Sequence, residues 1–152
     1  LSIKGPGTEW AEQTKTRSGC GLKIHVEYLL NEDTINTLSI SPSNVNDITA
    51  AINQIQIQPG WVYVYDKAYA DYNWWHMIHV SGAFFVTRPK KNAKIRILSK
   101  RKLDKKSNPY ILADKYVQLS NKKPRGGKDN KLASITLRLI EAIDPITGKK
   151  YS

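Results

Sequence analysis

Residues 61–91 read WVYVYDKAYADYNWWHMIHVSGAFFVTRPKK, and this stretch decides the fold class. Its beginning, Trp61–Asp66, alternates apolar residues with others, which is typical of a β-strand. We expect this strand to bury Val62 and Val64. The strand ends on a carboxylate, Asp66, and the chemistry of that residue is the main question that the sequence raises.

A helix and a second strand are predicted after Asp66. The apolar spacing in residues 70–80 predicts a helix, and the Ser81-Gly82 pair is a typical helix end. Residues 83–87 (AFFVT) predict a short buried strand. We expect one side of the helix to carry Tyr72, Trp75, Ile78 and His79.

The chain before residue 61 predicts further alternation of strands and helices. Residues 22–30 alternate as a half-exposed strand, and residues 37–40 predict its hairpin partner. Asn46 or Asp47 is a suitable N-cap for a following helix, and Pro59-Gly60 separates that helix from the strand at Trp61. We expect a polar, irregular arm over residues 1–20. The order strand, strand, helix, strand, helix, strand predicts a mixed sheet with helices packed on it, an α/β domain.

The chain after residue 88 is different in character. Residues 88–131 are rich in Lys and Arg, and short apolar runs predict strands at 95–98, 116–119 and 132–140, with a turn at 144–150. The whole chain carries 24 Lys and Arg against 13 Asp and Glu, a net charge of +11. Such an excess favours a polyanionic partner, nucleic acid first and an anionic membrane surface second.

Several classes of protein are excluded by composition. No apolar run is long enough to cross a membrane, and the first residues lack the apolar stretch of a signal peptide. A single cysteine, Cys20, excludes an internal disulfide and a cysteine-based zinc cluster, and we interpret it as a small buried or half-buried residue. A reducing, cytoplasmic compartment fits.

Asp66 has two interpretations when it is taken alone. A carboxylate at the carboxyl end of a buried strand lies where open α/β sheets bind ligands. An aspartate at that place also begins turns or caps the next helix.

The longer context of Asp66 resembles the DDE transposases of bacterial insertion sequences. In that family a strand ends in a catalytic Asp followed by a basic, a small and an aromatic residue, here Asp66-Lys67-Ala68-Tyr69. A helix then leads to a strand that here reads Gly82, Phe84-Phe85-Val86-Thr87-Arg88-Pro89-Lys90. The segments GLKIHVEYLL and SPSNVNDITAA also look like the family's earlier strand and helix entry.

The resemblance implies an RNase H-like mixed sheet with flanking helices over residues 1–89. It also implies a basic, β-rich insertion over residues 90–152, which rests on position and strand content. Two Asp and one Glu of this family hold two Mg²⁺ or Mn²⁺ ions about 3.5–4 Å apart, which stabilise the attacking and leaving oxygens of phosphoryl transfer. Asp66 matches the second aspartate and is the one catalytic and metal-binding residue that we predict.

The chain departs from the family pattern at the other two ligands. No Asp precedes Asp33, and the motif Tyr-x₂-Arg-x₃-Glu-x₆-Lys has no match, because Glu141 lacks Tyr and Arg at the required offsets. Since residue 1 is also not methionine, we expect an internal fragment that lacks the first strand and the last helix of the domain and is inert alone.

Four basic residues are candidates for DNA binding. The Arg and Lys of the family that match Arg88, Lys90 and Lys91 contact the DNA backbone, and Lys67 lies beside Asp66. Cations suit phosphate contacts because they release counterions. The alternative is a solvated, charged turn, and the same alternatives apply to the basic runs 100–106 and 122–131.

The histidines and tryptophans carry weaker signals. His25 is interpreted as a surface residue. His76 and His79 are three apart on a helix, but no third metal ligand is evident, so we interpret them as packing residues. Trp75 is expected in the core. Trp74 has two interpretations, burial in the core and stacking on bases.

We therefore expect a DNA transposase that cleaves and joins the ends of an insertion sequence. Its expected partners are transposon-end and target DNA and a second copy of the protein, and its expected place is the bacterial cytoplasm at the nucleoid. The alternatives are a non-catalytic DNA-binding module, either a transposon remnant or a domesticated domain, and a nuclease with the same core.

Overall fold

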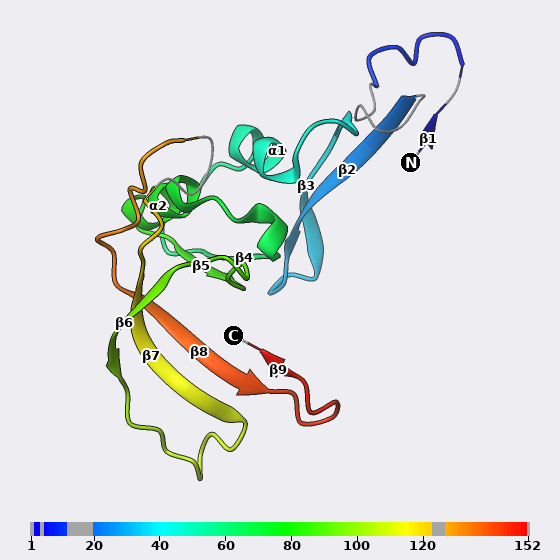
Figure 1. Cartoon of the computed structure of the whole chain (residues 1–152). Helices are drawn as coiled ribbons and strands as arrows, with labels where there is room; N and C mark the ends of the chain where they lie inside the picture. The colour runs from blue at the N-terminus through cyan, green and yellow to red at the C-terminus, as the bar shows by residue number, and fades with distance from the viewer. Residues whose placement is uncertain (1, 4, 12–19, 123–126, 152) are drawn as a thin grey trace. The chain divides into compact units, whose positions relative to one another are not determined.

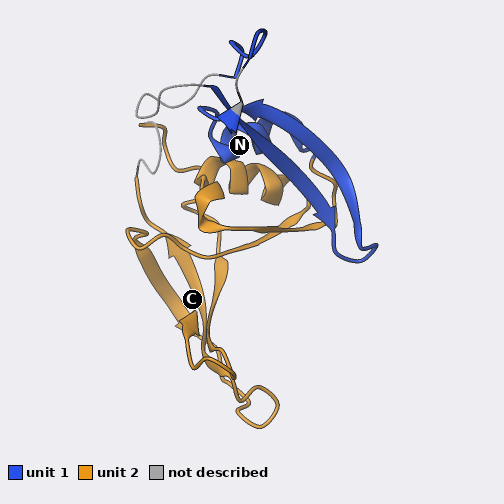
Figure 2. Cartoon of the chain, turned by 90° about the vertical axis from the view of Figure 1, so that its right-hand side faces the viewer, with its two compact units in different colours: residues 1–56 blue, residues 57–152 orange. Residues whose placement is uncertain are grey.

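The computed structural model describes residues 2–3, 5–11, 20–122 and 127–151, and it is a mixed α/β structure (Figure 1). The chain divides into two compact units, residues 1–56 and residues 57–152 (Figure 2). The arm predicted over residues 1–20 lies partly outside the described residues. Its described part contains a short strand, β1 (Ser2–Ile3), that pairs with Gly21 and Cys20.

The first unit is built on an antiparallel hairpin. Strands β2 (Cys20–Leu29) and β3 (Thr34–Pro42) pair from Leu22 opposite Pro42 to Leu29 opposite Thr34, and Asp33 adopts a positive φ of 53° in the turn between them. The predicted hairpin is therefore confirmed, although both strands are longer than the alternation indicated. Cys20 is half-buried at the start of β2.

Helix α1 (Asp47–Gln54) follows the hairpin, and Asn46 is its N-cap residue. The helix buries Ile48 and Ala51. The Nζ atom of Lys23 on β2 donates to the carbonyl of Val45 and to Asp47 Oδ1, at 2.9 and 3.0 Å. These contacts tie the polar face of β2 to the start of α1.

The second unit begins with a strand–helix–strand arrangement. Strand β4 (Val62–Tyr65) pairs in parallel with β5 (Phe84–Thr87), and helix α2 (Tyr72–Val80) connects them. Asp71 caps α2 by accepting from the backbone N–H groups of Asn73 and Trp74. The helix ends as predicted, because Gly82 takes a positive φ of 74° just after it.

The packing face of β4 differs from the prediction. Val62 and Val64 are 58% and 62% exposed, whereas Tyr63 is only 6% exposed. The physical reason is that α2 packs over the face that carries the aromatic residues, where Trp75 stacks on Phe85 at 5.1 Å between ring centroids. Tyr63 is opposite Phe85 in the register and therefore shares this face.

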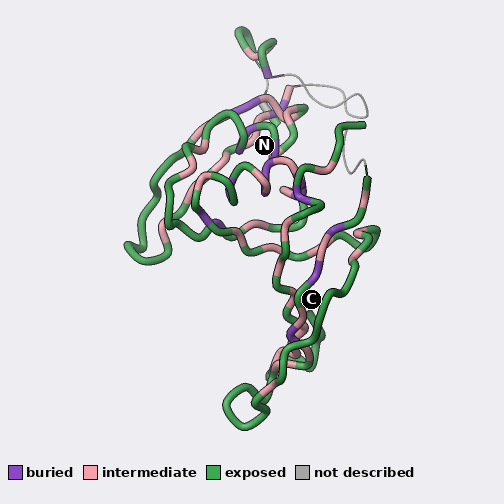
Figure 3. Tube along the Cα trace, turned by 90° about the vertical axis from the view of Figure 1, so that its left-hand side faces the viewer, coloured by how far each residue is buried: buried purple, intermediate pink, exposed green. Residues whose placement is uncertain are grey.

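The predicted face of α2 is correct except at one residue. Tyr72, Trp75 and Ile78 are buried, but His79 is exposed. The tube in Figure 3 shows how burial alternates with exposure along the chain.

The remaining strands form an antiparallel sheet in the order β6-β7-β8-β9, and the two strand pairs described above belong to other sheets. The prediction of a β-rich second half is confirmed, and the boundary at residues 89 and 90 stays a prediction. The four strands are β6 (Ile95–Lys100), β7 (Ile111–Leu119), β8 (Leu137–Ile143) and β9 (Lys150–Tyr151).

Asn121 joins the end of β7 to the rest of the second unit. Its Oδ1 accepts from the backbone N–H of Lys94 at 2.7 Å and from the Tyr72 hydroxyl at 3.2 Å. Its Nδ2 donates to the carbonyl of Asn92 at 3.3 Å. One side chain therefore holds the segment before β6 against helix α2.

Replacement of Trp75 by alanine tests the packing that holds α2 on the sheet. Because Trp75 is 2% exposed and stacks on Phe85 and Tyr72, we expect Trp75→Ala to lower the free energy of unfolding by about 3–5 kcal/mol. Met77 is half-exposed on the same helix, so Met77→Ala is the matched control and should change it by less than about 0.5 kcal/mol. Equal effects in urea denaturation would contradict the described packing.

Candidate active site at the end of strand β4

Two charged side chains meet where the parallel strands end. Tyr65 on β4 is opposite Thr87 on β5, so the next residues, Asp66 and Arg88, leave the sheet side by side. The Nη2 atom of Arg88 donates to Asp66 Oδ2 at 2.7 Å. The carboxyl ends of parallel strands are the usual place for ligands in α/β folds, so this edge is the candidate active site.

Asp66 also shapes the backbone that follows it. It precedes the short 3₁₀ helix η1 (Lys67–Tyr69), and its Oδ1 accepts from the N–H of Ala68 at 3.0 Å. Its side chain and that of Arg88 are 50% and 49% exposed. The turn-capping interpretation of Asp66 is therefore correct for one oxygen, while the residue stays open to solvent at the strand end.

The contacts of Asp66 keep it ionised. The pKa of its carboxyl lies below the ordinary value of 3.8, first because Ala68 donates a backbone hydrogen bond and next because Arg88 donates one. Desolvation opposes this change, and the charges of Arg88 and Lys67 add smaller contributions. An ionised carboxylate is the form that a metal ligand requires.

The described residues fit a divalent metal only in part. A carboxylate oxygen is the ligand type that Mg²⁺ and Mn²⁺ prefer. Within the described ranges, however, no group of three or more His, Cys, Asp or Glu side chains is close enough to hold an ion. Asp66 is thus suitable as one ligand, but the described chain does not assemble a two-metal centre.

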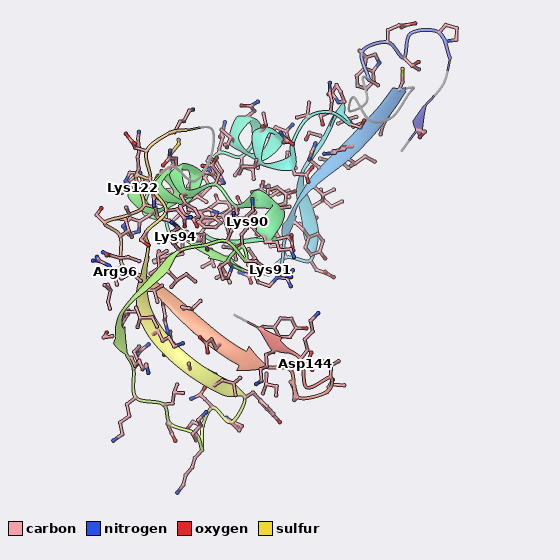
Figure 4. The ribbon with its side chains drawn as sticks, viewed as in Figure 1. Lys90, Lys91, Lys94, Arg96, Lys122 and Asp144 are labelled. Atoms are coloured by element: carbon pink, nitrogen blue, oxygen red, sulfur yellow. The ribbon has the colours of Figure 1, made fainter. Side chains whose placement is uncertain are left out.

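The three predicted DNA-binding lysines are all exposed, but they lie on different segments. Lys67 is the first residue of η1. Lys90 and Lys91 begin the turn before β6, which is closed by a hydrogen bond from the N–H of Ala93 to the carbonyl of Lys90 at 2.9 Å (Figure 4). Of the four predicted basic residues, the structure brings only Arg88 into contact with Asp66.

The remaining sequence candidates are Trp74, Trp75 and the three histidines. Trp74 is 3% exposed, which excludes stacking on bases, and Trp75 is in the core as expected. His25 Nε2 is hydrogen-bonded to Ser41 Oγ at 2.8 Å in the first unit. His76 and His79 belong to no metal-type cluster within the described part of the chain.

Sequence reasoning missed one charged cluster on the antiparallel sheet. Asp114 on β7 is buried, accepts hydrogen bonds from Arg138 and forms an ion pair with Arg101. The alternation of β7 and β8 could have placed these residues on one face, but only the register shows that they meet.

Comparison with known proteins shows the family. The profile of the transposase DDE domain matches residues 2–143. The chain is also 36% identical, over 104 residues, to a protein of Sinorhizobium fredii (strain NBRC 101917 / NGR234) named "Putative transposase y4zB". The aligned part covers 67% of this chain and 29% of that relative. No solved structure matches the chain at a significant level.

The chain belongs to the DDE transposase family. Members of this family act on DNA and generally use a divalent metal. The resemblance drawn from residues 61–91 is therefore confirmed. None of the described helices is of a length and apolarity that would cross a membrane.

The titration of Asp66 tests the geometry of the site. We expect the ¹³C chemical shift of its carboxyl to titrate with a midpoint below 3.8. Because Ala68 still donates, Arg88→Gln should raise the midpoint without restoring 3.8. Since this pKa is lowered in the folded state, the stability that it contributes is present above the ordinary pKa and is lost as pH falls through the lowered one.

Arg96→Gln is the matched control for this titration, because Arg96 is an exposed arginine that donates to Gln118 and not to Asp66. It should leave the midpoint unchanged. A wild-type midpoint at or above 3.8, or no rise in Arg88→Gln, would show that the described contacts of Asp66 are wrong.

Proposed function

We propose that this chain is part of the catalytic domain of an insertion-sequence DDE transposase that cleaves and rejoins DNA with divalent metal ions. The observation that carries the proposal is the position of Asp66, an ionised, half-exposed carboxylate at the carboxyl end of a parallel strand pair. The family membership of residues 2–143 supplies the reaction class.

The proposed fold is RNase H-like. Its support is an antiparallel hairpin, β2–β3, followed by a helix, and a parallel pair, β4–β5, joined through α2. In this arrangement residues 1–89 are the core and residues 90–152 the basic insertion. A solved structure of a complete relative tests this assignment. An RNase H-like sheet requires one further strand that lies beside β2 and β4 in space.

Asp66 has the acceptor capacity to hold a cation. An ionised carboxylate offers about four lone-pair sites, and the structure uses one for the N–H of Ala68 and one for Arg88. When bound, Mg²⁺ or Mn²⁺ supplies charge stabilisation for phosphoryl transfer. The hydrogen bonds from the Ala68 N–H and from Arg88 keep the carboxylate ionised and hold its orientation.

The proposed substrate is DNA, and the proposed contacts are Arg88, Lys67, Lys90 and Lys91. Lys90 and Lys91 support this assignment because they are exposed and neither side chain has a hydrogen bond or ion pair within the described residues. Arg88 donates to Asp66, so we propose that its main role is to hold this carboxylate and that contact with a DNA phosphate is its second role.

Catalysis requires more ligands than this chain offers. The other two acids of the triad have no match in the sequence, and the aligned part spans 29% of the relative's length. We therefore propose that cleavage is a property of a longer protein that contains this segment and that acts as a dimer on paired DNA ends.

A second candidate function is a DNA-binding module without catalysis, such as a transposon remnant. The Asp66–Arg88 ion pair favours it, because the carboxylate is already neutralised without a metal. The net charge of +11 fits both functions. Cleavage by the complete protein decides between them.

The variant Asp66→Asn tests the catalytic assignment in a complete transposase that carries this segment. Loss of a metal ligand costs several kcal/mol of transition-state stabilisation, so we expect DNA-end cleavage to fall at least about a hundredfold. End binding, measured by gel shift, should change little, because the asparagine Oδ1 still accepts from Ala68.

Asp144→Asn is the matched control, since Asp144 Oδ1 also accepts backbone hydrogen bonds from residues two and three positions ahead, Ile146 and Thr147 (Figure 4). It should leave cleavage unchanged. Full cleavage by Asp66→Asn would overturn the assignment of Asp66.

The double variant Lys90→Gln/Lys91→Gln tests the proposed phosphate contacts beside the site. Each lost contact should reduce the slope of log affinity against log salt by about 0.9, so the variant should lose up to about 1.8. Fluorescence anisotropy with labelled duplex DNA measures this slope. A slope equal to that of the wild type would show that neither lysine contacts a DNA phosphate.

A further inference from the structure

One face of the sheet β6-β7-β8-β9 gathers positive charge. In antiparallel strands, residues opposite each other share a face. Arg96 is opposite Gln118, and Arg138 is opposite Tyr116. Lys94 precedes Arg96 by two positions, and Arg101 donates its backbone N–H to the carbonyl of Asp114 at 2.8 Å. We name Lys94, Arg96, Arg101 and Arg138 the basic face.

Two arginines of the basic face are held by one buried carboxylate. Arg138 donates from Nε and Nη2 to the two oxygens of Asp114, at 3.0 and 2.9 Å. The Nη1 atom of Arg101 lies 3.2 Å from Asp114 Oδ2. The hydrogen bond from Arg138 is the main reason that the pKa of Asp114 is lowered, so this carboxylate stays ionised.

The other two cations are also positioned. Arg96 donates to the side chain of Gln118. The backbone of Lys94 is fixed between Asn121, which accepts from its N–H, and Ser120, which donates its N–H to its carbonyl at 2.7 Å. Figure 4 shows Lys94 and Arg96 following one another at the start of β6. Arg96 and Arg138 are therefore presented by strands, and Lys94 and Arg101 are the residues next to the two ends of β6.

The opposite face of the same sheet is different. Val117 and Leu119 are buried there, and Lys115 is paired with Glu141 across β7 and β8. Lys100, opposite Lys115, and Lys150, opposite Ile143, also lie on that face. Both faces therefore carry an excess of positive charge, and what distinguishes the basic face is that two of its arginines share one buried carboxylate.

The basic face holds more charge than it neutralises. Four cations and one carboxylate leave an excess of three positive charges (four minus one) on three adjacent strands. Like charges on neighbouring strands destabilise a sheet. Arg101 and Arg138 have donors left over after binding Asp114, since each guanidinium has five N–H groups. An external polyanion would both use these donors and relieve the repulsion.

We propose that the basic face binds the phosphate backbone of double-stranded DNA. The inference rests on the proposed DNA-cleaving function and extends it to a second contact surface, separate from Asp66. Arginine forks match phosphate geometry, and a β-strand edge presents them at regular intervals. Single-stranded binders instead stack bases on open aromatic rings, whereas the guanidinium carbon of Arg101 already lies over the Tyr116 ring, 5.6 Å from its centroid.

The test measures binding of the chain of residues 1–152 to a short, fluorescein-labelled duplex between about 50 and 200 mM salt. The variant Lys94→Gln/Arg96→Gln removes two cations but leaves the Asp114 cluster intact. Its slope of log affinity against log salt should fall by about 1.8. The control Lys106→Gln/Lys150→Gln removes two exposed cations off the basic face, because Lys150 is opposite Ile143, and should change the slope much less.

The outcomes separate the two proposals. Equal slope changes in both variants, or tighter binding of a single strand that is lost in Tyr116→Leu, would overturn the basic face while leaving the DNA function standing. No binding of any DNA by the wild-type chain, or binding only to anionic vesicles, would also overturn the binding of DNA by the basic face, whereas the proposed function is tested separately by cleavage in the complete protein. If Lys94→Gln/Arg96→Gln does not fold, Ser99→Lys decides, since Ser99 is opposite Tyr116: a steeper slope supports the proposal and an unchanged slope overturns it.

Discussion

The parallel pairing of β4 with β5 is the constraint on which the candidate site depends. Four register pairs align the two strands, and the stacking of Trp75 on Phe85 holds helix α2 against them. Because parallel strands end at the same edge, Asp66 and Arg88, which are 22 positions apart in the chain, become neighbours. A slip of one residue in this register would move one of the two charges to the other face of the sheet.

The sequence was sufficient to predict the elements around the site. Helix α2 and its end at Ser81-Gly82 followed from apolar spacing and the glycine C-cap, and Asp66 was placed correctly at the end of its strand. The face that β4 packs could not be predicted, because both phases of VYVY are apolar. The structure resolves this in favour of Tyr63, which shares its face with Phe85 beneath Trp75.

Contacts between distant segments could not be predicted from the sequence, because they depend on how the strands are aligned. The Asp66–Arg88 pair depends on a register, and so does the cluster of Asp114 with Arg101 and Arg138. The net charge predicted a polyanionic partner. From the sequence alone, however, the basic residues could be grouped only as runs along the chain. The sheet instead sorts them by face, which places Lys94, Arg96, Arg101 and Arg138 on one side.

Asp66 and the basic face illustrate two uses of charge in one unit. At the strand end, one carboxylate is balanced by one arginine and remains half-exposed, which suits a group that exchanges its partner for a metal. On the sheet, one buried carboxylate holds two arginines and leaves an excess of positive charge, which suits a fixed surface for phosphates. We therefore propose that the basic face adds a second DNA contact to the one beside Asp66.

The most direct test of the central claim is a crystal structure of a complete transposase that carries this segment, soaked with Mn²⁺ and measured at the manganese anomalous edge. We expect a manganese peak within about 2.0–2.3 Å of an Asp66 carboxylate oxygen, close to the range for Mg²⁺, with Arg88 displaced from that oxygen. A manganese ion bound elsewhere, with Asp66 still paired to Arg88, would contradict it.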